Sequence, residues 1–166
     1  DAFDTHVEPR NGLHIHVNRK SFFSKTEERK FIALWNLGDP KSQAFLSMLS
    51  RRTTPLKDQN YCKPHPSLQH RTPYYLLGIG LDDPDGVSNR RVSCHTTSAT
   101  VEVRIFQSIF DLDHILNCIQ IVGAMHQFAS ESSYSCVKPG FTDMFTDWVR
   151  SRKGYIRVKN ILDGKK

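Results

Sequence analysis

The segment TVEVRIF, residues 100–106, constrains the fold more than any other part of this sequence, because its side chains alternate in character. Successive side chains of an extended chain point to opposite faces. The alternation separates two sets, one with Val101, Val103 and Ile105 and the other with Glu102, Arg104 and Phe106. A period of two predicts a β-strand whose first set packs on a hydrophobic core.

A second strand is predicted over residues 13–17. Ile15 and Val17 would share one face of it, and His14 and His16 the other. Residues 74–79 are expected to form a further short strand. It would lie between residues 53–73 and 82–89, which are predicted to be loops because they contain proline and other turn-forming residues.

Helices are predicted where capping residues precede apolar residues at helical spacing. The expected helices are residues 26–37 with Thr26 as N-cap, residues 40–50 after an Asp39 cap, a long helix after an Asp111 cap, and residues 141–149 and 155–162. The long helix is expected to bury a stripe made of Leu112, Ile115, Leu116, Ile119 and Val122, and the core to include Phe22, Phe23, Phe31 and Trp35. This order of elements predicts an α+β fold, an antiparallel sheet with helices packed on one face, and 166 residues favour a single domain over 1–166.

The net charge of +6 favours an anionic partner. The basic residues come in scattered pairs, which fit a phosphate pocket better than a long nucleic-acid footprint. The four cysteines, Cys62, Cys94, Cys118 and Cys136, have no zinc-binding spacing, so free thiols in a reducing, cytoplasmic compartment are expected, with association with a virion left open. No apolar run approaches the roughly 18 residues of a membrane helix, so no membrane partner is expected.

Both predicted strands carry chemistry-bearing side chains on the face away from the core. His14 and His16 share such a face, with Asn18 two residues further on, and Glu102 and Arg104 share another. Imidazole and carboxylate can bind a divalent cation, whereas guanidinium can hold a carboxylate or phosphate. The simpler alternatives are a solvent-facing histidine pair and a cross-strand ion pair.

Three segments in this order resemble the amidoligase family, carboxylate–amine ligases that share the glutamine synthetase fold. They are NGLHIHV at 11–17, the stretch from Phe45-Leu46 to Ser50-Arg51-Arg52, and TVEVRIF followed by a long helix. The resemblance implies a glutamine-synthetase-like catalytic domain. The family's earlier strand with two carboxylates, E-x-E, cannot be found before Gly12. The chain is therefore expected to be the C-terminal portion of such a domain, without its N-terminal strands.

The resemblance also implies roles for individual residues. His14 and Glu102 would bind Mg²⁺, and His16 and Asn18 would lie near ATP. Arg104 would hold the transferred phosphoryl group or the substrate carboxylate. Arg52 would steady phosphates, and Arg91 matches a basic position of the family less closely. ATP would activate a carboxylate as an acyl phosphate, and an amine would then attack to form an amide or isopeptide bond.

Two other functions remain open. Because His14 and Glu102 alone make a poor cage for Mg²⁺, either an upstream segment or another chain supplies the missing carboxylates, or the domain is a non-catalytic assembly protein. The third reading is a nucleic-acid-binding module that uses the basic C-terminal region, Arg150, Arg152, Lys153, Arg157 and Lys159. The remaining histidines, at 65, 70, 95, 114 and 126, are expected to be solvent-facing or packing residues.

Overall fold

The computed structural model describes residues 12–52 and 93–165. The strand predicted at 74–79, the loops predicted at 53–73 and 82–89, Cys62 and Arg91 lie outside the described residues. Within them the fold is α+β, as predicted, with five α-helices, two short 3₁₀ turns and three strands.

The strands form one antiparallel sheet in the order β1-β3-β2. β1 spans Gly12–Asn18, β2 spans Cys94–Thr96 and β3 spans Thr100–Gln107. The register places both His16 of β1 and His95 of β2 opposite Glu102 of the central strand. The face that carries the histidines of β1 is the more exposed one, so the predicted alternation of residues 13–17 is confirmed.

β3 carries one extra residue opposite His14. Leu13 pairs with Phe106, whereas Ile15 pairs with Val103, so Arg104 and Ile105 together face His14. A bulge of this kind changes the direction of the side chains that follow it. Phe106, which strict alternation places beside Glu102, is instead fully buried, and its ring centroid lies 6.0 Å from that of Trp35. The prediction for Phe106 was therefore wrong because a period of two does not survive a bulge.

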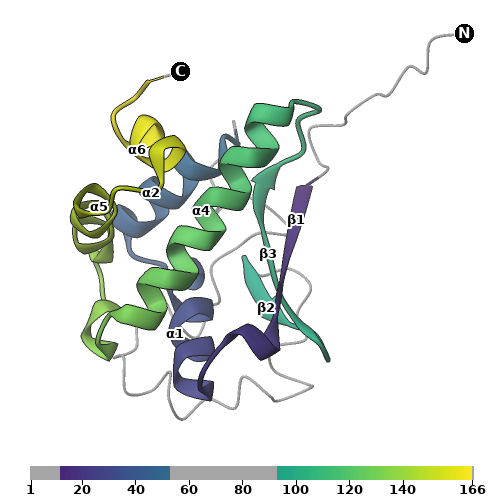
Figure 1. The fold of residues 1–166 in the computed structure, drawn as a ribbon, viewed down its shortest axis with the longest axis vertical. Helices are drawn as coiled ribbons and strands as arrows, with labels where there is room; N and C mark the ends of the chain where they lie inside the picture. Colours follow the sequence, from purple (N-terminus) through teal and green to yellow (C-terminus); the bar gives the residue numbers. More distant parts are fainter. Residues whose placement is uncertain (1–11, 53–92, 166) are drawn as a thin grey trace, which may run out of the picture.

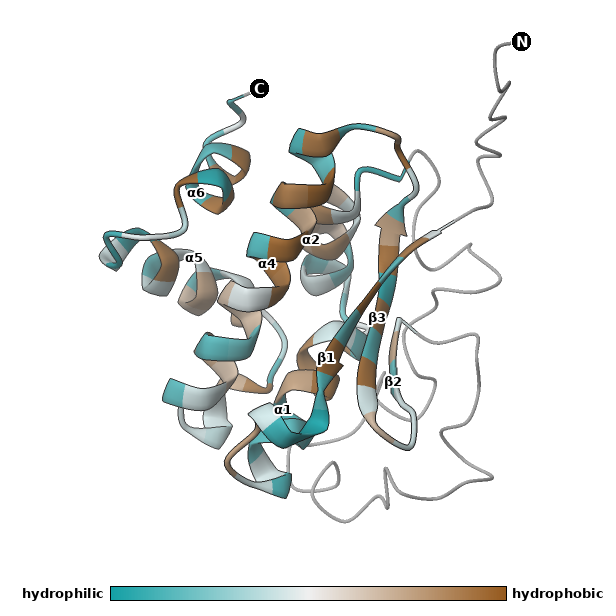
Figure 2. Ribbon diagram, turned by 45° about the vertical axis from the view of Figure 1, so that its right-hand side comes forward, coloured by the Kyte–Doolittle hydropathy of each residue, from teal (hydrophilic) through white to brown (hydrophobic). Residues whose placement is uncertain are grey.

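The helices lie on one side of the sheet, to the left of the strands in Figures 1 and 2. After the 3₁₀ turn η1 (Arg19–Ser21) come α1 (Lys25–Asn36) and α2 (Pro40–Ser50), and after β3 come α4 (Leu112–Glu131), the turn η4 (Tyr134–Cys136), α5 (Phe141–Ser151) and α6 (Ile156–Leu162). None of the described helices is both long and apolar enough to cross a bilayer.

The caps of the helices follow the sequence with one exception. Asp39 accepts a hydrogen bond from the backbone N–H of Ser42, and Asp111 one from Asp113, as predicted. α1 is capped by Ser24 and not by Thr26. The Ser24 hydroxyl accepts from the N–H of Glu27, and the Glu27 carboxylate accepts from the N–H of Phe23, which makes a reciprocal capping arrangement.

The buried face of α4 differs from the predicted stripe. Leu112 is 70% exposed and Ile119 53% exposed, whereas the buried side chains are His114, Cys118, Ile121, Val122, Ala124, Met125, Phe128 and Ala129. Figure 2 shows hydrophobic residues on the first turns of this helix. His114, expected as a solvent-facing or packing residue, is buried, and its Nε2 lies 2.9 Å from the carbonyl oxygen of Gln107.

The hydrophobic core lies between the helices and the sheet. It includes Phe22, Phe31 and Trp35, as predicted, but Phe23 is almost fully exposed. Phe23 stands one residue before the Ser24 cap, where its backbone N–H is used by Glu27. The exposed position of Phe23 is therefore set by the N-terminal cap of α1 and not by the apolarity of its ring.

His126 of α4 makes the stability of this fold depend on pH. Its ring lies against Phe22, and burial lowers its pKa below 6.5, while Glu27 opposes the shift. The unfolded chain therefore binds this proton more readily, and the free energy of unfolding should fall as the pH drops below about 6.5, by at most about 1.4 kcal/mol per pH unit. Urea unfolding between about pH 7.5 and 5.5 measures the slope. His126→Gln should make the slope less steep without removing it, because burial lowers the pKa of His14 and His95 as well. An equal slope in that variant would contradict the assignment.

Candidate functional site

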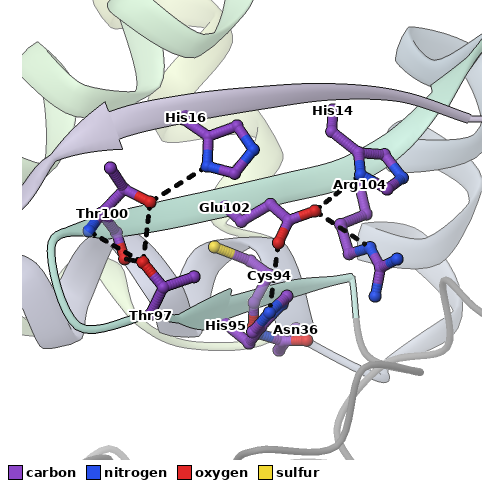
Figure 3. A network of polar contacts seen from close by, with 9 residues as sticks. All are labelled: His14, His16, Asn36, Cys94, His95, Thr97, Thr100, Glu102 and Arg104. Carbon is purple, nitrogen blue, oxygen red and sulfur yellow. Dashed lines mark hydrogen bonds and ion pairs between the residues drawn. The ribbon is translucent and has the colours of Figure 1, made fainter.

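Glu102 is the centre of a polar cluster on the sheet face away from the helices (Figure 3). Its carboxylate is 8% exposed, and basic side chains from all three strands surround it. Oε1 lies 2.7 Å from His14 Nδ1 of β1 and 3.3 Å from Arg104 Nε of β3, and Oε2 lies 3.2 Å from His95 Nε2 of β2. The structure thus brings together His14, Glu102 and Arg104, three of the residues that the sequence singles out.

The bulge in β3 contributes to this convergence. Arg104 is the residue two positions after Glu102, and the extra residue of β3 falls between Val103 and Phe106. His14 faces this widened part of the strand, and its ring reaches the Glu102 carboxylate from the neighbouring strand. Bulges next to functional sites commonly redirect a side chain in this way.

His95 belongs to the cluster, although its place in the sequence indicated only a packing or solvent-facing histidine. It is buried, as a packing residue would be, but its Nε2 is directed at Glu102. β2 has only three residues, CHT, and its short length offers no alternation from which a face could be predicted. Only the pairing of β2 with β3 places His95 opposite Glu102.

Burial is the main reason why the histidines of the cluster stay neutral. It lowers the pKa of both His14 and His95, and the nearby Arg104 charge lowers both further, while Glu102 acts in the opposite direction. A neutral imidazole donates through one nitrogen and accepts through the other. Because a carboxylate only accepts hydrogen bonds, we expect the hydrogens on His14 Nδ1 and His95 Nε2.

His16 and Asn18 lie on the same face of β1, but the polar contacts found for their side chains go to residues other than Glu102. His16 is paired with Glu102 in the register, yet its Nδ1 lies 3.0 Å from the Thr100 hydroxyl (Figure 3). The Asn18 side chain accepts a hydrogen bond from the N–H of Lys20 and caps the turn η1. Their placement near a nucleotide stays a prediction, and each already has a contact within the fold.

Arg52 follows the end of α2 and lies against the bulged part of β3. Its Nε donates to the carbonyl oxygen of Ile105 at 2.7 Å, and its Nη2 donates to that of Phe106 at 3.0 Å and to that of Arg104 at 3.4 Å. These contacts hold the backbone of the bulge. A role in steadying phosphates stays a prediction, as does that of Arg91, which lies outside the described residues.

The described residues do not fit a Mg²⁺ ion shared by His14 and Glu102. His14 uses Nδ1 toward Glu102, so its remaining nitrogen, Nε2, points away from that carboxylate. Mg²⁺ needs about six ligands, mostly oxygens, in a near-octahedral arrangement. Residues 12–52 and 93–165 contain no group of three or more His, Cys, Asp or Glu side chains that could hold a metal ion.

The cysteines of the described segments take no part in the cluster's chemistry. Cys94, Cys118 and Cys136 are free and buried, which confirms the expected free thiols at these positions. Burial raises the pKa of Cys118 to about 12 and also raises the pKa of Cys94 and Cys136. Thiols with such pKa values are poor nucleophiles at neutral pH.

Comparison of the chain with family models, with curated proteins and with solved structures found no match. The cluster around Glu102 and the resemblance of the three sequence segments are therefore the features that indicate a function.

Proposed function

We propose that this chain carries part of the active site of an ATP-dependent carboxylate–amine ligase, in a domain of glutamine-synthetase-like fold. The observation that supports the proposal most is the convergence of His14, Glu102 and Arg104. Glu102 comes 88 positions after His14, and Arg104 comes two positions after Glu102. The three side chains nevertheless meet on the sheet face away from the helices.

The chemistry needs positive charge more than a nucleophilic side chain. The substrate carboxylate attacks the terminal phosphoryl group of ATP, the bond to the leaving ADP breaks, and an acyl phosphate forms. The amine then attacks the acyl carbon, inorganic phosphate leaves, and the nitrogen loses a proton. Arg104 would stabilise the negative charge on the phosphoryl oxygens, and Glu102 would hold its guanidinium in place.

Mg²⁺ is expected in such a reaction from the resemblance, but no step is assigned to it. Oxygen ligands beyond the described residues would be needed to complete its coordination. Arg104 can still bind, orient and neutralise an anionic group without them.

One observation favours the assembly protein as the second candidate. Phe110, Leu112 and Ile119 are exposed around the first turns of α4, and exposed apolar residues on one helix often mark a contact with another chain. The nucleic-acid reading has less support, because Arg150, Arg152 and Arg157 each pair with a carboxylate of the same chain.

The decisive experiment measures ATP binding and ligation with the full chain. Equilibrium dialysis with Mg·ATP gives the affinity, and hydroxylamine, used as the amine with a mixture of amino acids as carboxylates, traps acyl phosphates as hydroxamates. We expect Arg104→Gln to lower hydroxamate formation by at least about 100-fold, because a charge-stabilising donor is lost.

Arg150→Gln is the matched control, since it removes one arginine from a surface ion pair with Asp163. It should leave both binding and hydroxamate formation unchanged. If the protein, isolated from its source with any upstream segment or partner chain, neither binds Mg·ATP nor forms hydroxamates, the ligase proposal is refuted and the assembly protein is favoured.

A further inference from the structure

We propose that His95 is a positioning residue that fixes the carboxylate of Glu102, and that Glu102 in turn fixes the ring of His14, so that Nε2 is the nitrogen left to meet a ligand. The three side chains form one relay across β2, β3 and β1 (Figure 3). The inference rests on the proposed function for the use made of His14, but its geometry is tested independently of ligation.

Each oxygen of Glu102 has its own imidazole partner. Oε1 lies 2.7 Å from His14 Nδ1, and Oε2 lies 3.2 Å from His95 Nε2. Rotation of the carboxylate would break both contacts together. An ionised carboxylate only accepts hydrogen bonds, so both rings are held in a defined tautomer.

The exposure of the three side chains gives the relay a direction. His95 is 6% exposed and Glu102 8% exposed, whereas the side chain of His14 is 38% exposed. His95 Nδ1 is buried, and among residues 12–52 and 93–165 it has no hydrogen-bond partner. A ligand on the sheet face away from the helices can therefore meet His14 without touching His95. His95 then acts on the ligand only through Glu102.

The backbone of β2 is anchored next to His95. The buried Asn36 side chain at the end of α1 donates to the carbonyl oxygens of Ile32 and Cys94, at 2.9 and 2.8 Å. Cys94 precedes His95, so the helix layer fixes the strand from which the His95 ring projects. A hydrogen-bonding chain that orients a reactive imidazole commonly extends over two such shells.

The test begins with the unaltered protein. Imidazole ¹⁵N shifts at about pH 8, where unperturbed histidines are neutral, distinguish the two tautomers. We expect His14 to carry its hydrogen on Nδ1 and His95 on Nε2, with the His14 signal assigned by its loss in His14→Gln. If His14 instead carries its hydrogen on Nε2, the relay does not exist.

Two substitutions of His95 separate positioning from packing. His95→Gln keeps an N–H near the place of Nε2, whereas the shorter His95→Asn does not reach Glu102. We expect His95→Asn to give a mixture of His14 tautomers and to lower hydroxamate formation about 10–100-fold, and His95→Gln to recover at least tenfold of that loss.

The outcomes distinguish this inference from the proposed function. Urea unfolding checks that both variants fold. Equal His14 tautomers and equal turnover in the two folded variants would overturn the relay. The predicted tautomers, together with no ligation by the protein isolated from its source with any upstream segment or partner chain, would keep the relay and refute the ligase.

Discussion

Phe106→Ala is expected to lower the free energy of unfolding by about 3–5 kcal/mol, the usual cost of removing a fully buried aromatic ring. The ring is completely buried, and it contacts Trp35 edge-on at 6.0 Å. Its loss would leave a cavity between β3 and α1 that neighbouring side chains cannot fill without leaving their own contacts. Urea unfolding monitored by the tryptophan fluorescence would measure the change.

Phe110→Ala is the matched control for this prediction. Phe110 lies four residues later and is 89% exposed, so its truncation should change the free energy of unfolding by less than about 0.5 kcal/mol. Similar costs for the two variants would mean that the bulge does not turn Phe106 toward the helices.

Arg52→Ala is expected to destabilise the fold by about 2–4 kcal/mol, because three carbonyl oxygens of β3 would lose a charged donor. Gly12→Ala should act on the same contact, since a Cβ at Gly12 would lie 2.7 Å from Arg52 Nη2. The guanidinium cannot move aside without giving up its hydrogen bonds. We expect Gly12→Ala alone to cost about 1–3 kcal/mol.

A double-mutant cycle tests whether the two effects share one cause. In the Arg52→Ala background, Gly12→Ala should cost less than about 0.5 kcal/mol, because the obstructing nitrogen is gone. Additive costs in the double variant would show that Gly12 is required for a reason unrelated to Arg52. The free energies again come from urea unfolding.

Local sequence rules predicted most of the described secondary structure because caps and alternation are local signals. Asp39 and Asp111 cap helices as expected, and the two alternating strands pair with each other. The errors arise where a distant contact decides. Phe106 is turned toward the core by a bulge that is defined only by the pairing of β3 with β1.

The candidate site was predicted in part for the same reason. His14, Glu102 and Arg104 lie on strands whose alternation fixes their faces, so their convergence follows from pairing β1 with β3. His95 was missed because its short strand has no periodicity, and only the hairpin partner gives it a direction. The structural contacts of Arg52 also carry no sequence signal, since they go to backbone oxygens.

The sheet contains one pairing between strands that are close in the sequence and one between strands that are far apart. This difference sets the order in which the sheet can assemble. β2 and β3 form a hairpin of neighbouring residues, whereas the contact between His16 and Thr100 closes a separation of 84 residues. Long-range closures cost more chain entropy and are made later in folding. His95 and Glu102 would thus meet early, and His14 would join them only when the edge strand β1 docks. Detachment of β1 would remove His14 while leaving the hairpin intact, so a ligand held by His14 would also slow the local unfolding of this edge.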